Sequence, residues 1–216
     1  MKVTGKRSKN GLLYVWIIAA AVAVIATLNG VLMPPVYATN GWWLVFATVL
    51  STVAVIAADG IVALVVNHLP KKWFNHKSKF FTVGAKEKKF YEKLKIRKWK
   101  DRIPELGALG GFSKSEISDP YNNEYVERFL TEIACGEIVH IASLFFGFVI
   151  FTIFPKYILT VGLPVALVNV ALNIPSIFIL RYNAHKLEVL FKANVKREQR
   201  AKKKQEEILA EAAVTE

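Results

Sequence analysis

Four long apolar stretches, separated by polar ones, dominate the pattern of residues along the chain. They cover residues 12–33, 42–66, 138–154 and 157–180. A helix of about 20 apolar residues crosses a hydrocarbon core of roughly 30 Å. The first stretch exceeds the roughly 7–15 residues of a signal-peptide core, so we interpret it as a retained helix. The pattern predicts an all-α integral membrane protein with four transmembrane helices.

Positive charges collect on one side of these predicted helices. Residues 67–116 contain fourteen Lys or Arg against five Asp or Glu, and residues 1–10 contain four Lys or Arg and no acid. The two connections expected on the other side carry only Lys156. Because loops rich in Lys and Arg stay in the cytosol, we expect a multi-pass protein of the cell membrane with both termini cytosolic.

Charge and hydropathy together divide the chain into five segments. They are a basic N-terminus (1–11), transmembrane helices 1 and 2 (12–66), a basic cytosolic interfacial segment (67–137), transmembrane helices 3 and 4 (138–180) and a basic helical tail (181–216).

The interfacial segment between helices 2 and 3 mixes basic with aromatic residues, a composition typical of chain lying in the lipid headgroup layer. Phe90, Leu94 and Lys98 recur every four residues and predict a short helix over residues 86–98. Asp119-Pro120 predicts the start of the helix that leads into the third span.

Overall composition leaves nucleic acid out of the expected partners. The formal charge of +12 and the pI near 9.7 would fit it, but the basic residues flank apolar spans. We therefore expect membrane lipid as a partner and no nucleic acid. The single cysteine, Cys135, excludes an internal disulfide framework.

The candidate chemistry lies where the third span begins. Glu137 and His140 stand at i and i+3 of the expected helix, and Glu132 lies about two turns before His140. His140 is a candidate general base, with Glu137 orienting its ring, since imidazole titrates near neutral pH. The alternative is a metal site in which Glu132 or Asp59 adds a third ligand. We favour the base, because di-iron helical proteins need the Glu-x-x-His motif twice and it occurs once here.

Other polar residues are expected at the same cytosolic end of the helices. Asp59 interrupts the second span, and a carboxylate within a membrane helix is a functional candidate. Asn169 and Asn173 share a face of the fourth helix, beside Pro175, and Arg181 and Asn183 follow where that helix leaves the membrane. We predict a site that faces the cytosol and is open to lipid.

A basic block completes the candidate site. Lys98, Lys100 and Arg102 flank Trp99 and Asp101. The cations would bind the phosphates of acyl-CoA, while the indole anchors the segment in the interface. A plain lipid-binding patch is the alternative reading of the same charges.

Five motifs follow one another in an order that resembles the family of glycosyl-4,4'-diaponeurosporenoate acyltransferases, membrane enzymes of carotenoid biosynthesis. They are the residues 96–105 around Trp-Lys-Asp, Gly-Gly-Phe-Ser-Lys at 110–114, Glu132 through Glu137 to His140, Asn-Ile-Pro at 173–175 and Arg-Tyr-Asn at 181–183. The resemblance extends over roughly residues 69–187. It implies transfer of a fatty acyl group to a sugar hydroxyl of a lipid-linked glycoside.

The sequence therefore predicts a membrane acyltransferase that moves an acyl group from acyl-CoA to a lipid-linked acceptor, without a bound cofactor or metal. Glu132, Glu137 and His140 are the expected catalytic residues. Two alternatives stand beside it: a small membrane methyltransferase of lipid or isoprenoid substrates, and a scaffold whose basic segments bind anionic lipid.

Overall fold

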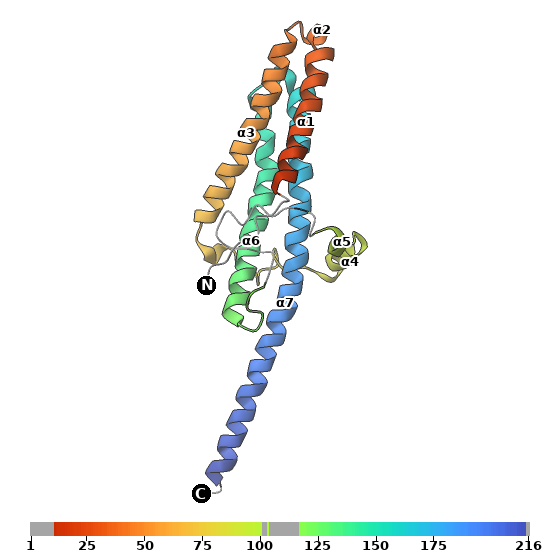
Figure 1. Cartoon of the computed structure of the whole chain (residues 1–216). Helices are drawn as coiled ribbons and strands as arrows, with labels where there is room; N and C mark the ends of the chain where they lie inside the picture. Colours follow the sequence, from red (N-terminus) through yellow and green to blue (C-terminus); the bar gives the residue numbers. More distant parts are fainter. Residues whose placement is uncertain (1–10, 101–102, 104–116, 215–216) are drawn as a thin grey trace.

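The computed structural model describes residues 11–100, 103 and 117–214, and this part of the chain is helical throughout its regular structure (Figure 1). The long helices are α1 (Gly11–Leu32), α3 (Gly41–His68), α6 (Asn123–Phe146) and α7 (Leu163–Val214). The short ones are α2 (Pro34–Tyr37), α4 (Ala85–Lys93) and α5 (Ile96–Trp99), with 3-10 turns at Lys71–Trp73, Gly147–Thr152 and Pro155–Tyr157 and a π-helical turn at Ile158–Gly162.

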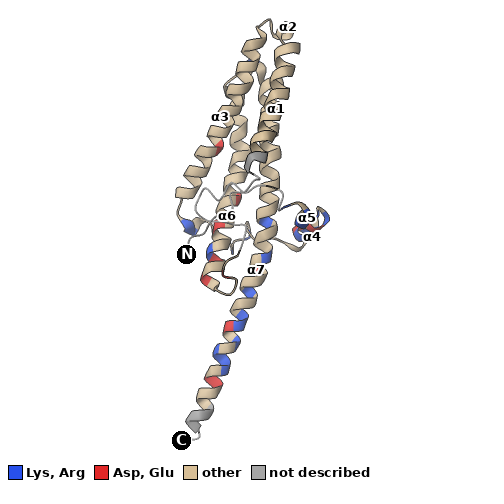
Figure 2. Ribbon diagram, in the orientation of Figure 1, with Lys and Arg blue, Asp and Glu red and all other residues tan. Residues whose placement is uncertain are grey.

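Four of these helices are long and apolar enough to cross a membrane, which confirms the predicted all-α membrane class. Their outward faces carry large apolar side chains, among them Trp42 (79% exposed) and Leu159 (74% exposed). Apolar side chains are stable in contact with lipid, so their exposure on the outer faces of these helices fits a bilayer environment. In Figure 2 the charged residues are concentrated at the end of the bundle that carries α4, α5 and the projecting part of α7.

α1 and α3 form an antiparallel hairpin whose helices approach closely at two glycines. A Cβ atom on Gly41 would lie 2.3 Å from the carbonyl oxygen of Gly30, so only glycine fits at that position. The Asn40 side chain caps α3 by accepting a hydrogen bond of 2.8 Å from the backbone N–H of Trp42. Asn29 of α1 donates to the Thr160 carbonyl at 2.7 Å and connects this hairpin to the start of the fourth span.

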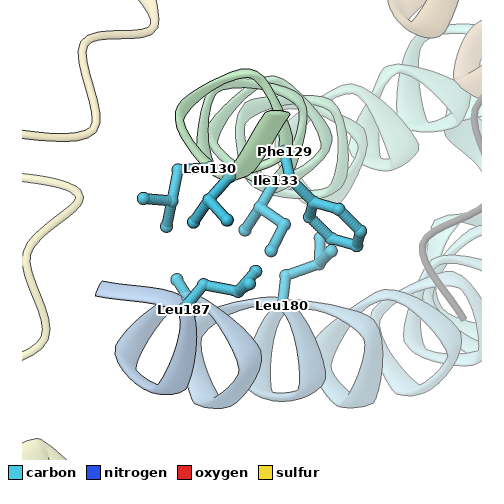
Figure 3. Close-up of a cluster of buried hydrophobic side chains, with 7 residues drawn as sticks. Phe129, Leu130, Ile133, Leu180 and Leu187 are labelled. Carbon is cyan, nitrogen blue, oxygen red and sulfur yellow. The ribbon is translucent and has the colours of Figure 1, made fainter. Parts of the chain in front are cut away.

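α6 and α7 pack along each other through the buried cluster drawn in Figure 3. Phe129, Leu130 and Ile133 of α6 face Leu180 and Leu187 of α7, and all five are at least nine-tenths buried. A second buried cluster joins the inner end of α3 to Phe74 and Phe81 and to Ala134 and Cys135 of α6. This second cluster places the turns around Phe74 and Phe81 against the end of α3 and against α6.

Two predicted boundaries within residues 67–137 are wrong. The expected helix over residues 86–98 is divided into α4 and α5, because Lys95 adopts a left-handed conformation (φ 53°) that ends α4. The indole of Trp99 then donates to the Leu94 carbonyl at 3.0 Å, which satisfies an acceptor that the break leaves open. α6 starts at Asn123 rather than at Asp119-Pro120, because the Asn122 side chain caps the Tyr125 N–H at 3.1 Å.

α7 runs through the predicted boundary at residue 180 without interruption. It is a single helix of 52 residues with Pro175 inside it, and a helix of that length extends over about 80 Å. The transmembrane part and the tail are thus one rigid element, which projects beyond the rest of the bundle in Figure 1.

We predict that the two ends of the bundle lie on opposite sides of the membrane. In a Cys135→Ala background, a cysteine at Thr39 should react with an impermeant thiol reagent from outside intact cells. A cysteine at Ala201, on the exposed part of α7, should react only after the membrane is opened. Labelling of both from outside would contradict the assigned topology.

We also predict that the cluster between α6 and α7 determines stability. Ile133→Ala should destabilise the protein by about 2–5 kcal/mol, the cost of a buried cavity of this size. The measurement is thermal unfolding in detergent. Ile208→Ala is the matched control, because Ile208 is 56% exposed on the projecting part of α7. An equal loss of thermal stability in the two variants would show that the cluster does not determine stability.

Candidate active site

A single guanidinium group joins three parts of the chain at the end of the bundle that carries α4 and α5. Arg181 of α7 forms a two-point ion pair with Glu87 of α4, in which Nη2 lies 2.9 Å from Oε2 and Nε bonds to Oε1. Its Nη1 donates to Oε1 of Glu137 on α6 at 2.5 Å and to the Phe80 carbonyl at 3.0 Å. Arg181 therefore fixes α4 and the residue-80 turn against α6 and α7.

The groups around Arg181 are removed from solvent. The side chain of Glu137 is 1% exposed and that of Arg181 is 15% exposed. A buried carboxylate is tolerated when it is paired, so Arg181 accounts for the burial of Glu137. The guanidinium also holds the pKa of Glu87 below its ordinary value. Tyr91 donates its hydroxyl to Glu87 at 2.5 Å, and burial together with that carboxylate raises the pKa of the phenol.

A second polar group lies one helical turn further into the bundle. The Nδ1 atom of His140 is 2.8 Å from Oδ1 of Asn173. Asn173 donates its amide to Oδ1 of Asn169 at 2.8 Å, and Asn169 donates to the Ser143 carbonyl at 3.0 Å. We call His140, Asn173, Asn169 and Ser143 the amide ladder. It crosses between α6 and α7 twice and orients the imidazole.

The structure gives Glu137 and His140 partners on α7 that the sequence did not predict. Glu137 bonds to Arg181, 44 residues away, and the ring of His140 is oriented by Asn173, 33 residues away. A guanidinium is a strong partner for a buried carboxylate, because its hydrogen bonds are charge-assisted. The i, i+3 spacing brought Glu137 and His140 close together, but it did not determine their partners.

Asp59 approaches the amide ladder from α3. Its carboxylate lies within hydrogen-bonding reach of the side chains of Ser143, Asn169 and Asn173. The structure thus brings Asp59, Asn173 and His140 together at one depth, although they come from three helices far apart in the sequence.

The remaining candidates are more dispersed. Glu132 forms an ion pair of 3.0 Å with Lys71, in the 3-10 turn that follows α3, and lies half-buried. Lys98 is exposed, Lys100 is half-buried, and Trp99 packs on the cluster of Val83, Tyr91, Ile96 and Ile179. Asn183 is half-buried on α7. Asp101 and Arg102 lie outside the described residues, as do residues 104–116 of the family motifs.

Sequence reasoning missed Glu87 and Tyr91. They stand at i and i+4 of α4, where a carboxylate and a phenol can meet, but they are embedded among lysines that made the stretch look like a uniform basic surface. Their role became visible only through Arg181. Within the described residues, no three side chains of His, Cys, Asp or Glu gather as metal ligands would.

Comparison with known proteins identifies the family of this chain. The family model described as glycosyl-4,4'-diaponeurosporenoate acyltransferase matches residues 70–193. A curated protein of that name from Staphylococcus haemolyticus (strain JCSC1435) is 30% identical over 135 residues, which cover 60% of this chain and 76% of the relative. No solved structure matches the chain significantly. The matched region contains Glu87, Glu137, His140, Asn173 and Arg181, and the chain belongs to the glycosyl-4,4'-diaponeurosporenoate acyltransferase family.

Proposed function

We propose that this acyltransferase moves a fatty acyl group from acyl-CoA to a sugar hydroxyl of a lipid-linked glycoside at the cytosolic face of the cell membrane. The family name describes an acceptor that is a carotenoid glycoside, and an acceptor of that class is the one proposed here. Membership in an acyltransferase family sets aside methyl transfer and a purely scaffolding role. The observation that carries the mechanism is the hydrogen bond between His140 and Asn173.

The direction of the amide ladder determines which nitrogen of His140 acts as the base. Asn173 uses its amide nitrogen to donate to Asn169, so its Oδ1 is the atom that faces His140 and can only accept. The Nδ1 atom of the ring must then carry the proton. In neutral imidazole the other nitrogen, Nε2, holds the lone pair. Asn173 thereby prepares His140 for proton abstraction through Nε2.

The proposed reaction is a direct acyl transfer. His140 Nε2 takes the proton of the sugar hydroxyl as the hydroxyl oxygen attacks the thioester carbonyl carbon. A carbon–oxygen bond forms, the carbon–sulfur bond breaks, and the proton passes from the imidazolium to the departing CoA thiolate. The products are an ester and free CoA. No covalent enzyme intermediate and no bound metal are needed.

Charged groups near the base are proposed to hold the substrates. The ion pair of Arg181 with Glu137 lies one turn from His140 on the cytosolic side. Asp59, beside Ser143, Asn169 and Asn173, is proposed to accept a hydrogen bond from an acceptor hydroxyl. Glu132 and Asn183 line the same end of the bundle and are proposed to contact the sugar.

We predict that His140→Gln reduces turnover by roughly 10²-fold or more, because general-base assistance is typically worth ~10²–10⁴. The assay follows transfer of a labelled acyl group from acyl-CoA into lipid by detergent-purified protein. His68→Gln is the matched control, since His68 lies exposed at the end of α3 and bonds only locally, to the Leu64 carbonyl. Loss of activity with a chelator and recovery with a divalent metal would contradict the base mechanism.

We predict that changes at Asn173 alter the pH dependence of turnover. Asn173→Leu removes the acceptor for Nδ1–H and should lower kcat by roughly 10-fold, the value of one buried hydrogen bond. Asn173→Asp keeps the acceptor but adds a negative charge that favours the imidazolium. The acidic limb of its kcat–pH profile should therefore move to higher pH, and turnover should recover in alkaline buffer.

The measurement is a profile of kcat against pH for the three proteins. An unchanged acidic limb in Asn173→Asp, with folding intact, would show that His140 is not the group that titrates during turnover.

A further inference from the structure

A cavity of about 290 Å³ lies between α4 and α7, outside the part of the site described so far. Its α4 wall contains Lys88, Tyr91 and Glu92, and its α7 wall contains Tyr182, His185 and Lys186. It therefore combines two ammonium groups and an imidazole with two phenol rings. Neither the family match nor the proposed chemistry assigns it a role.

Positive charge predominates in the stretch that forms the α4 wall of this cavity. Between residues 85 and 100 eight Lys or Arg stand against two glutamates. Glu87 is already committed to Arg181, and Glu92 lies 4.0 Å from Lys88, a distance at the limit of an ion pair. The α4 and α5 surface beside the cavity thus keeps a strong positive potential, which attracts anions such as phosphate.

The α7 wall holds its cation in place. The Lys186 ammonium lies over the Tyr182 ring, 4.5 Å from its centroid, in a cation–π contact. His185 is half-buried beside it. A lysine whose position is already fixed loses less freedom when an anion binds.

The cavity is connected to the candidate active site. Tyr91 belongs to the cavity wall and donates to Glu87, Glu87 pairs with Arg181, and Arg181 bonds to Glu137. Along α7, His185 lies twelve residues beyond Asn173, and this number of helical residues spans about 18 Å. An extended pantetheine arm, which separates the phosphates of CoA from its thioester, has a comparable length.

We propose that this cavity binds the phosphates at the nucleotide end of the acyl donor, with Lys88, Lys186 and His185 as the contacts. The proposal rests on acyl-CoA as the donor. It moves the main phosphate contacts from the block around Trp99, which the sequence favoured, to the facing walls of α4 and α7. The block remains beside them, because Trp99 packs on the same cluster as Tyr91 and Tyr182.

The test separates binding from turnover. Free CoA is titrated onto the purified full-length protein by calorimetry, and KM and kcat are measured with labelled acyl-CoA. Lys186→Gln and Lys88→Gln should each weaken CoA binding by roughly 10-fold and raise KM to a similar extent with kcat unchanged, since a charge-assisted hydrogen bond is lost. Lys196→Gln, an exposed lysine of α7 outside the cavity, should change neither value.

Two results would overturn the proposal. In the first, Lys98→Gln or Lys100→Gln raises the Kd for CoA while Lys186→Gln and Lys88→Gln do not, which returns the phosphates to the sequence-predicted block. In the second, Lys186→Gln leaves CoA binding intact but weakens binding to vesicles of phosphatidylglycerol, which makes the cavity a lipid headgroup site.

Failure of the donor assignment has a different signature. If acyl-CoA gives no labelled ester while wild-type protein still binds CoA in a manner sensitive to Lys186→Gln, the proposed reaction is wrong, and the cavity is a CoA-phosphate site that does not serve acyl transfer.

Discussion

The end of the bundle that carries α4 and α5 depends on the charge of Arg181. One guanidinium makes four hydrogen bonds through two of its edges: Nε and Nη2 bond to Glu87, and Nη1 bonds to Glu137 and the Phe80 carbonyl. A buried carboxylate without a cation would cost several kcal/mol, so Glu137 can occupy its place in α6 only while Arg181 is present. In turn, these partners fix the position of the Arg181 guanidinium. The position of α4, and with it one wall of the cavity, follows from this arrangement.

The amide ladder satisfies buried polar groups between α6 and α7 without using charge. Asn173 and Asn169 are buried, and their amides donate to Oδ1 of Asn169 and to the Ser143 carbonyl of α6. Their polar groups are thus satisfied within the protein, as a membrane-spanning segment requires. All their hydrogen bonds run in one direction from donor to acceptor, which starts at Nδ1 of His140 and ends at the Ser143 carbonyl. Gly147 makes room for the ladder, because a Cβ there would lie 2.3 Å from the Asn169 amide nitrogen. A structural network of this kind therefore also sets the tautomer of the candidate base.

α7 connects these features with one another. The same helix carries, in this order along the chain, Asn169 and Asn173 of the ladder, Arg181 of the ion-pair network and the Lys186 wall of the cavity. Because a continuous helix is stiff, its register couples the depth of the base to the position of the proposed donor cavity. A break at the membrane surface, which the change of composition at residue 180 suggested, would have uncoupled them.

Local physical chemistry was sufficient for much of this protein. Hydropathy determined the four spans, because each run of apolar residues is long enough to cross the bilayer by itself. The same local view placed Glu137, His140, Asn173 and Arg181 at the inner ends of the helices. It failed at Lys95 and Asn122, where a single left-handed residue and a side-chain cap moved helix boundaries.

The partners of the site residues were decided only by the tertiary structure. Arg181 lies 94 residues from Glu87 and 44 from Glu137, and Asn173 lies 33 from His140. Which of several polar groups satisfies a buried charge depends on how α4, α6 and α7 pack, and helical periodicity along one segment contains no information about that packing.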